Sequence, residues 1–328
     1  MEYPSLDTAK AGAIRFNTDS SQMEIYVANE WIGMSASSPE MLTGGTRAFF
    51  AGGTNGGSNR IDYVNVDTTG DAIDFGDLTT TRWICKGTAS RVRGLIQGDR
   101  PAAATIDFIQ IATTGDAGDF GDMTEAREDP CGTCNGSRAV FMSGGNTPAL
   151  NVIDYVHIAS IGNAQDFGDL QQKRVGGGSC ESKIRGFVAG GGTSPGQTKT
   201  IEYINFSTLS NGATWGDLVA NAYGNSGCSN AVRGVFNAGY HPGHTNAIEF
   251  FSIASFGNAQ DFGDLAEIKY APGSASSPTR GVWAGNYPTS SVTINYVQIM
   301  TKGDALDFGD LTQGRGHTAG SSNGHGGI

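Results

Sequence analysis

Acidic side chains recur in a short phrase and are the first candidates for chemistry. Asp71-Ala-Ile-Asp74-Phe-Gly-Asp77 holds three carboxylates within seven residues, and such oxygens can bind Ca²⁺. Strand residues three apart point to opposite faces, however, so these carboxylates would not converge. The corresponding phrase Asn211-Gly-Ala-Thr-Trp-Gly-Asp217 keeps only one carboxylate. We therefore interpret the phrases as structural turns and strand ends, with calcium binding as the alternative.

Paired cysteines and histidines are the second candidates. Cys131-Gly-Thr-Cys134 has the spacing of zinc and redox sites, but zinc needs a second pair and a redox site needs a thioredoxin-like context. His241-Pro-Gly-His244 lies in a turn-rich loop with no third ligand in view. The five cysteines are predicted to be free, buried thiols, since a chain this large needs no disulfides. We expect no metal, no cofactor and no catalytic residue set, and hence no enzymatic activity.

Charged residues also recur at fixed positions of a repeat. Six arginines open predicted second strands, and the third strands carry an acid or an asparagine. The arginines are Arg47, Arg93, Arg138, Arg185, Arg233 and Arg280, and the third-strand residues are Asp62, Asp107, Asp154, Glu202, Glu249 and Asn295. The two sets are expected to pair as part of the scaffold. A ring of arginines facing a central channel and binding an anionic ligand is the alternative.

The overall charge excludes one class of partner. The net charge is -11 and the pI is near 4.8, and no cluster of Lys and Arg occurs, so binding to a phosphate backbone is not expected. The sequence also has no basic start followed by an apolar run and no apolar stretch of about 18 residues. We expect a soluble protein, made in a cytoplasm, that interacts with neither nucleic acid nor the membrane interior.

The elements that position these residues belong to a repeat. Phe75-Gly-Asp-Leu78 returns at Phe120, Phe167, Trp215, Phe262 and Phe308, at intervals of 45, 47, 48, 47 and 46 residues. Periods near 40 to 50 residues are typical of propeller blades with four strands each, and the 50 glycines favour short strands and tight turns. We predict an all-β fold in which residues 43–328 form a six-bladed β-propeller.

The second repeat shows the predicted order of strands within a blade. Its candidates are residues 84–90, 93–98, 105–111 and 115–123, separated by Gly, Asp and Pro turns. The first repeat lacks the small-residue strand, whereas the tail carries an unmatched one at residues 315–323. We expect this tail to complete the first blade, because pairing the two ends removes the free sheet edges.

Residues 1–42 lie outside the repeat and predict a small β-meander with strands at 12–17, 22–27 and 28–32, followed by a small-residue linker. So short a segment buries little apolar surface by itself. Its large apolar side chains, Phe16, Ile25, Tyr26 and Trp31, are therefore predicted to contact a partner protein or a second copy of the chain.

Two sets of motifs carry a resemblance. The Gly-Gly after the second strand, the aromatic residue in the third and the Arg that opens the next unit resemble divergent kelch repeats. Ala13-Ile-Arg-Phe-Asn-Thr18 and Asn29-Glu-Trp31 at the front, with Ser322-Asn-Gly-His-Gly-Gly327 at the back, resemble structural proteins of tailed bacteriophages, especially marine and cyanobacterial ones. This resemblance implies a virion component, with other capsid, tail or fibre proteins as partners and the host cytoplasm as the place of synthesis.

The expected function is therefore a non-enzymatic virion protein that is anchored by its N-terminal segment and presents a propeller at the particle surface. Loops at corresponding places differ in chemistry and are candidate contacts to a host glycan or protein: Asn55, Ser58, Gln197, His241, His244 and Tyr287. A glycan-binding or catalytic propeller of the oxidase or glycosidase type, and an intracellular kelch adaptor, are the alternatives. The place on the particle, the receptor and the oligomeric state stay open.

Overall fold

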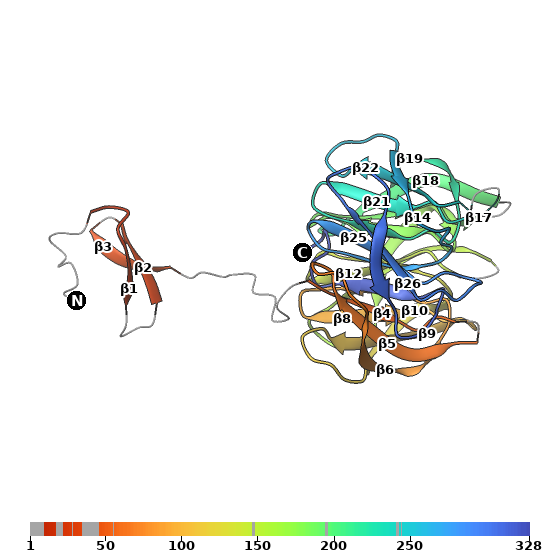
Figure 1. Ribbon diagram of the computed structural model, residues 1–328, viewed down its shortest axis with the longest axis horizontal. Helices are drawn as coiled ribbons and strands as arrows, with labels where there is room; N and C mark the ends of the chain where they lie inside the picture. Colours follow the sequence, from red (N-terminus) through yellow and green to blue (C-terminus); the bar gives the residue numbers. More distant parts are fainter. Residues whose placement is uncertain are drawn as a thin grey trace. The chain divides into compact units, whose positions relative to one another are not determined.

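The structure is a computed structural model of the 328-residue chain. It describes residues 10–17, 22–27, 29–34, 46–54, 56–145, 148–193, 196–240, 243 and 245–328. The chain divides into two units, Met1–Glu40 and Met41–Ile328 (Figure 1). The described ranges contain strands and turns but no helix, so the predicted all-β class is confirmed.

The first unit is a three-stranded antiparallel meander. Its strands are β1 (Ile14–Asn17), β2 (Gln22–Val27) and β3 (Glu30–Met34), with β2 in the middle. The register places Ile14 opposite Ile25 and Ile25 opposite Ile32. These three isoleucines therefore form one row across one face of the sheet, because partners in register point to the same side.

The described part of the second unit contains six sheets of antiparallel strands. We number them 1 to 6 along the chain and give the strands of each in order of pairing. Sheet 1 is β28 (Ala319–Ser322), β4 (Arg47–Ala51), β5 (Ser58–Asn65) and β6 (Ile73–Arg82); sheet 2 is β7 (Lys86–Ala89), β8 (Arg93–Gln97), β9 (Ala103–Gln110) and β10 (Gly118–Arg127); sheet 3 is β11 (Cys131–Cys134), β12 (Arg138–Met142), β13 (Leu150–His157) and β14 (Gln165–Arg174).

The remaining three sheets repeat this order. Sheet 4 is β15 (Gly178–Glu181), β16 (Arg185–Ala189), β18 (Gly196–Asn205) and β19 (Ala213–Ala222), with the short β17 (Gly192–Thr193) beside β18; sheet 5 is β20 (Gly227–Ser229), β21 (Arg233–Asn237), β22 (Ala247–Ser252) and β23 (Gln260–Asp264); sheet 6 is β24 (Gly273–Ser276), β25 (Arg280–Ala284), β26 (Thr293–Gln298) and β27 (Leu306–Asp310).

The first strands of the six sheets lie next to one another in a cycle. β28 contacts β7, β7 contacts β11, and the series continues through β15, β20 and β24 back to β28. This arrangement is that of a β-propeller, with the sheets placed around a common axis (Figure 1). The tail strand β28 pairs with β4, from Ala319 opposite Ala51 to Ser322 opposite Ala48. The tail thus takes the place in sheet 1 that the sequence predicted for it.

The repeated Phe-Gly-Asp phrase lies where neighbouring sheets meet. Phe75 is 3% exposed and packs in one cluster with side chains of sheets 1 and 2, so its ring lies between neighbouring sheets. Gly76 has a φ of +146°, and a Cβ there would lie 2.5 Å from the Gly115 carbonyl of the next sheet. Carboxylates of the phrase accept backbone N–H groups. The Asp77 N–H donates to the Asp116 carboxylate of the next repeat at 3.0 Å, and the Gly121 N–H donates to the Asp119 carboxylate at 3.1 Å.

Candidate functional site

Buried basic residues at the ends of the fourth strands fix the connections that lead from one sheet to the next. Arg82 donates to Asp107 of the next sheet at 2.8 Å, and both side chains are at most 1% exposed. Arg127 with Asp154, Arg174 with Glu202 and Arg315 with Asp62 repeat this ion pair. The third-strand acids therefore pair with these residues and not, as predicted, with the arginines that open the second strands.

Two of the six junctions depart from this pattern. Lys269 replaces the arginine in sheet 5, binds Glu267 at 2.7 Å and donates to backbone carbonyls of sheet 6, where Asn295 replaces the acid. In sheet 4 the basic residue is replaced by Ala222. The acid that would face it, Glu249, is 5% exposed and accepts the Val219 N–H at 2.8 Å. Burial raises the pKa of Glu249.

The residues that follow each basic position, or Ala222 in sheet 4, lie at one end of the circular arrangement of sheets. The second residue after the basic position is always left-handed, with φ between +50° and +68°: Ile84, Asp129, Gly176, Gly224, Ala271 and His317. Their backbones bond to one another around the axis, for example from Ala271 N–H to Gly224 O at 2.7 Å and from His317 N–H to Ala271 O at 2.8 Å. A β-branched side chain such as that of Ile84 seldom adopts this conformation, and such strain is concentrated at functional sites.

Aromatic side chains gather at this end, and we call Trp83, Tyr223, Tyr270, Tyr287 and His317 the aromatic mouth. Ring centroids lie 6.3 Å apart from Trp83 to Tyr287, 6.0 Å from Tyr287 to Tyr270 and 5.8 Å from Tyr270 to Tyr223. The four large rings are partly exposed. The three tyrosines therefore present amphipathic surface, apolar on the ring faces and polar at the hydroxyl groups, whereas the indole N–H of Trp83 is buried.

The connections explain how these rings are held. Gly224 has a φ of +62°, and a Cβ there would lie 2.2 Å from the Tyr270 ring, so glycine alone lets this ring lie against the turn. Burial raises the pKa of both Tyr223 and Tyr270. The two phenols consequently stay protonated and can both donate and accept hydrogen bonds.

His317 lies among these rings. Its ring centroid is 4.6 Å from that of Tyr287, 5.6 Å from that of Tyr270 and 5.9 Å from that of Trp83. The residue is 8% exposed, and its Nδ1 atom is buried without a hydrogen-bond partner. Burial lowers the pKa of His317 to about 4. The imidazole is therefore neutral at pH 7, with a polar atom that lacks a partner among the residues that the structure describes.

Two pairs of opposite charge border the mouth. Lys86 lies 3.4 Å from the Asp129 carboxylate, and Arg100 lies 3.9 Å from the Glu128 carboxylate. Arg100 also lies over the Trp83 ring at 5.4 Å. Burial alone would lower the pKa of Lys86, but the attraction of Asp129 outweighs it and raises that pKa. Both cations thus already face a carboxylate.

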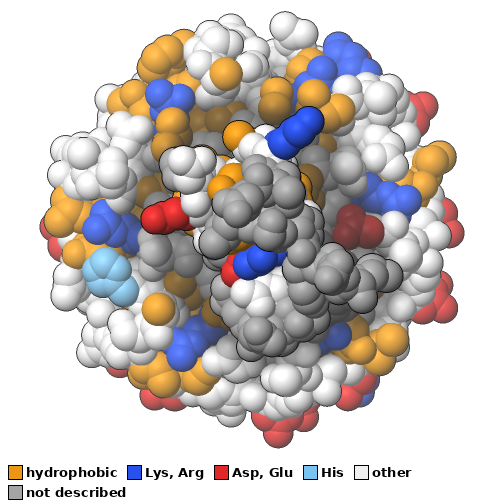
Figure 2. Space-filling view, turned by 90° about the vertical axis from the view of Figure 1, so that its left-hand side faces the viewer, with side chains coloured by type: hydrophobic (Ala, Val, Ile, Leu, Met, Phe, Trp, Pro, Cys, Tyr) orange, Lys and Arg blue, Asp and Glu red, His pale blue; other side chains and the backbone are white. Residues whose placement is uncertain are grey.

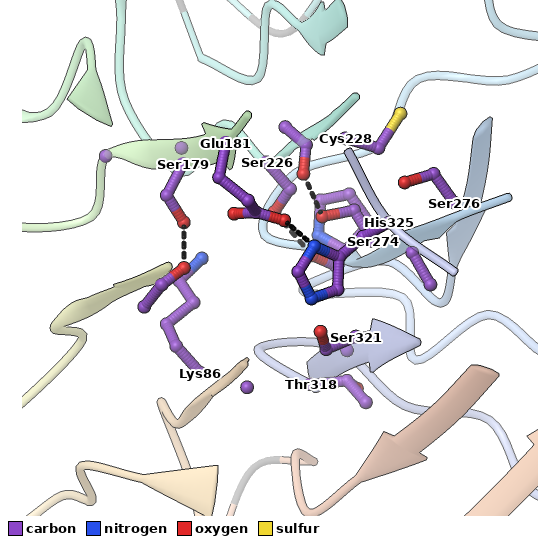
Figure 3. A pocket seen from close by; sticks show the side chains of 18 residues that line it. Lys86, Ser179, Glu181, Ser226, Cys228, Ser274, Ser276, Thr318, Ser321 and His325 are labelled. Atoms are coloured by element: carbon purple, nitrogen blue, oxygen red, sulfur yellow. Dashed lines mark hydrogen bonds and ion pairs between the residues drawn. The ribbon is translucent and has the colours of Figure 1, made fainter. Parts of the chain in front are cut away.

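Beneath the mouth, small side chains of all six first strands enclose a narrow central cavity (Figure 3). Its volume is about 40 Å³, which is room for a water molecule and not for a larger ligand. At the far end of the cavity the C-terminal tail brings in His325, whose Nδ1 lies 2.7 Å from the Glu181 carboxylate. Because this cavity is too small for a ligand larger than water, we expect a ligand to bind at the mouth.

The arginines that open the second strands have a structural role. Each lies half-buried over the aromatic residue of its own third strand, at 4.4 to 5.6 Å from the ring centroid. Each also donates to a backbone carbonyl of a neighbouring sheet, as Arg47 does to Ile111 O at 2.8 Å. On the face seen in Figure 2, Lys and Arg side chains are spaced around the ring beside hydrophobic ones. These contacts argue against a ring of arginines facing the channel.

The predicted loop contacts fall in three groups. Tyr287 belongs to the aromatic mouth, and Gln197 lines an open pocket of about 410 Å³ together with Tyr223, Tyr240 and Tyr270. Ser58 and Gln197 belong to the strands β5 and β18, so their assignment to loops was wrong. Asn55, His241 and His244 lie outside the described residues.

The predicted attachment residues do not form one patch. Tyr26 is 7% exposed and packs against Trp31, with ring centroids 5.2 Å apart, while the Arg15 guanidinium covers Trp31 at 4.2 Å. Ile25 belongs to the isoleucine row on the other face, in which Ile14 and Ile32 are about half exposed. The side chain of Phe16 lies outside the described part. Among the described side chains of this unit, the exposed apolar ones are therefore Val27 and those of the isoleucine row, whereas Trp31 is partly covered.

The thiols and acids were also candidates. All five cysteines are free and buried, as predicted, and burial raises the pKa of Cys85 and Cys131 to about 11. Within the described ranges no three His, Cys, Asp or Glu side chains come together as metal ligands. No helix of the same ranges is long and apolar enough to cross a membrane.

Most of the mouth was missed from the sequence. The residue after each basic position varies strongly: Trp83, Glu128, Val175, Tyr223, Tyr270 and Gly316. That variation at one fixed place of an otherwise regular repeat was the available signal. Only positions that stay the same from repeat to repeat were considered as signals, so this variable position was not identified.

Comparison with known proteins supports the fold alone. No protein-family profile and no curated protein matches the chain. Among solved structures, one described as "Structure of YjhT" is similar with a TM-score of 0.62 and 10% identity, over 74% of this chain and 88% of that one. So low an identity carries a likeness of fold and nothing about ligand or activity.

Proposed function

We propose that this chain is a non-enzymatic binding protein that takes its ligand at the aromatic mouth. The observation that carries this proposal is the set of partly exposed rings from Trp83 to Tyr223 around one end of the sheet ring. Exposed aromatic residues on a rigid scaffold are typical of recognition sites. The strained turns beneath them keep the rings in place, so little ordering is needed when a ligand binds.

The scaffold of this site is, in our proposal, a closed ring of six kelch-like blades. Its support is the cycle of contacts among the first strands and the pairing of β28 with β4. The repeated arginine contacts between sheets favour the same interpretation, since a ring with equivalent junctions needs equivalent bonds. A truncation that removes β28 would open this ring.

The setting that we propose is the surface of a tailed-phage particle, where the propeller contributes to host adsorption. This rests on the resemblance of the N-terminal and C-terminal motifs to phage structural proteins. The first unit would attach the chain to another virion protein through Ile14, Ile25 and Ile32. A row of exposed aliphatic side chains is typical of a protein contact, because a partner would remove this apolar surface from water.

A catalytic propeller is the second candidate, and the mouth favours it less. The Glu128 and Asp129 carboxylates each face a cation, and the imidazole and phenols have pKa values far from 7. An efficient general acid or base has a pKa near the working pH. Binding without turnover is therefore the simpler function for these groups.

The test uses full-length chains in assembled particles. Trp83→Ala should leave the protein in the particle, as measured by mass spectrometry, and should reduce adsorption to host cells. Ile14→Asp with Ile32→Asp should instead reduce incorporation. Unchanged adsorption by Trp83→Ala particles would refute binding at the mouth, and undiminished incorporation of the isoleucine variant would refute attachment through this row.

A further inference from the structure

We propose that the ligand of the aromatic mouth is a neutral carbohydrate chain of several sugar units that lies along the arc from Trp83 to Tyr240. This inference rests on the proposed binding function and adds the chemical class of the ligand. Three features of the described residues carry it: the series of neighbouring rings, the hydrogen-bonding groups beside them and the pairing of every cation at the mouth.

The rings form a series of neighbouring contacts, and three of them lie against His317. Trp83, Tyr287, Tyr270 and Tyr223 follow one another with similar centroid spacings of 6.3, 6.0 and 5.8 Å. The open pocket shared by Tyr223, Tyr240 and Gln197 continues this series. A sugar ring offers an apolar C–H face to an aromatic ring, so a row of aromatic residues suits a row of sugar units.

The polar groups along the arc match hydroxyl groups. The phenols of Tyr223 and Tyr270 stay protonated and hydrogen-bond to each other, and as a pair they still offer a donor and acceptors to a ligand. His317 adds an Nδ1 atom that is buried and has no partner in the described part of the chain. A buried polar atom without a partner costs free energy. A ligand hydroxyl that reaches Nδ1 when the surrounding rings shift would remove this cost, which makes His317 the group that we expect to fix one sugar unit in the mouth.

The charges argue against an acidic ligand. Lys86 faces Asp129 and Arg100 faces Glu128, so neither cation is left to balance a sugar carboxylate or sulfate. The whole chain also carries a net charge of -11, which repels anions at long range. A neutral ligand that binds through ring faces and hydroxyl groups meets no such penalty.

The experiment is calorimetric titration of the full chain with defined oligosaccharides of one to six units. The neutral probes are glucose, mannose, galactose and N-acetylglucosamine oligomers, and the acidic probe is an oligogalacturonate of matched length. At least one neutral series should bind, with affinity that rises about tenfold or more from one unit to four as successive rings are covered. The oligogalacturonate should bind more weakly than the neutral chain.

Three variants test the residues. Tyr270→Ala and Tyr223→Ala should each weaken binding of the four-unit chain by about tenfold, and Tyr223→Ala should leave binding of a single unit unchanged. His317→Phe removes Nδ1 while keeping a ring of similar size, and it should weaken binding of every length equally. Phe256→Ala is the matched control, because this ring is 63% exposed and lies against Trp215, outside the mouth.

The outcomes separate the two proposals. Tighter binding of the acidic probe, or affinity that does not depend on chain length, would overturn the neutral-chain assignment. If no carbohydrate binds but Trp83→Ala still abolishes adsorption, the mouth recognises another chemical class and only this inference fails. If no carbohydrate binds and Trp83→Ala leaves adsorption unchanged, both proposals fail together.

Discussion

Two buried histidines lie at opposite ends of the circular arrangement of sheets, His325 in the lining of the central cavity and His317 in the aromatic mouth, and they differ in their bonding partners. His325, at the end filled by the tail, is 4% exposed; its Nε2 lies 2.6 Å from Ala89 O and its Nδ1 2.7 Å from the Glu181 carboxylate. His317, at the aromatic mouth, is 8% exposed and has a buried Nδ1 without a partner. The burial is similar, so the difference lies in the partners.

This difference separates a structural end from a binding end. Burial alone would lower the pKa of His325, but the Glu181 carboxylate outweighs it and raises that pKa, so the ion pair holds the tail in place. At the mouth, burial without a carboxylate partner lowers the pKa of His317 to about 4. The histidine of the tail thus has its bonding capacity used within the fold, whereas the histidine of the mouth keeps a ring nitrogen without a partner among the described residues, which favours the mouth as the end for recognition.

Both ends depend on the junctions between sheets, so breaking a junction should have the largest effect. Arg127→Ala leaves the Asp154 carboxylate buried without its cation and should lower the free energy of unfolding by about 3 to 5 kcal/mol. Denaturant titration measures this loss. Adding Asp154→Asn should restore part of it, because the neutral amide is cheaper to bury. A loss under about 1 kcal/mol for the single variant would show that the ion pair does not hold the ring together.

The ring could be predicted from the sequence because its signals are local and repeated. Alternating strands, glycine turns and the recurring Phe75 position indicate sheets, and the unmatched strand at 315–323 indicated which segment pairs with β4. The partners of Asp107 and Asp154 could not be found in this way. The arginines that pair with these two acids lie in the preceding sheet. A repeat in the sequence does not show whether a side chain pairs within its own sheet or with a neighbouring sheet.

The binding end was harder to predict for a related reason. Trp83, Tyr223 and Tyr270 lie about a full repeat or more apart along the chain and meet only because the connections between sheets converge on one axis. The side chains at this position differ from repeat to repeat, whereas the residues that build the sheets recur. His317 was hidden further, since its left-handed backbone and the absence of a partner for Nδ1 are properties of the folded chain.

Acid should act on the two histidines in opposite directions. The pKa of His317 is lowered in the folded chain, so the unfolded chain binds a proton first and stability falls as the pH drops from about 6.5 towards 4. A shift of this size corresponds to up to about 3 kcal/mol at the acid end. His317→Phe should lack this part of the acid sensitivity when unfolding is followed at pH 7 and pH 4. Equal losses in the variant and the parent would mean that His317 is protonated freely in the folded state.

The closed end should respond to alkali instead. The pKa of His325 is raised, so the stability from its ion pair is fully present below the unfolded pKa near 6.5 and is lost as the pH rises through the folded pKa. Glu181→Gln should cost about 2 kcal/mol at pH 6 and less at pH 9. Glu125→Gln is the control, since Glu125 is exposed. Carbohydrate binding should stay unchanged in both variants. A loss of binding in Glu181→Gln would show that the mouth depends on the ion pair at the opposite end.

The smallest expected effect concerns the junction next to Tyr223, where the buried acid has no basic partner. Glu249 has a raised pKa because it is buried and Ala222 stands where other sheets have a cation. Its ionised form destabilises the fold above the folded pKa, and this penalty is absent below the unfolded pKa of 4.5. Glu249→Gln should therefore stabilise the protein by about 1 kcal/mol at pH 7 and by nothing near pH 4.

The companion variant Glu202→Gln separates this effect from a general tolerance of the third-strand position. Glu202 is ion-paired with the buried Arg174, so the same substitution should destabilise the protein there, as urea unfolding at pH 7 can measure. If the two substitutions change the free energy of unfolding in opposite directions, the junction leading to Tyr223 is less stable than the junctions with a complete ion pair. Destabilisation by Glu249→Gln at pH 7 would instead show that the Val219 N–H requires a charged acceptor, and the mouth would then rest on a junction as well satisfied as the rest.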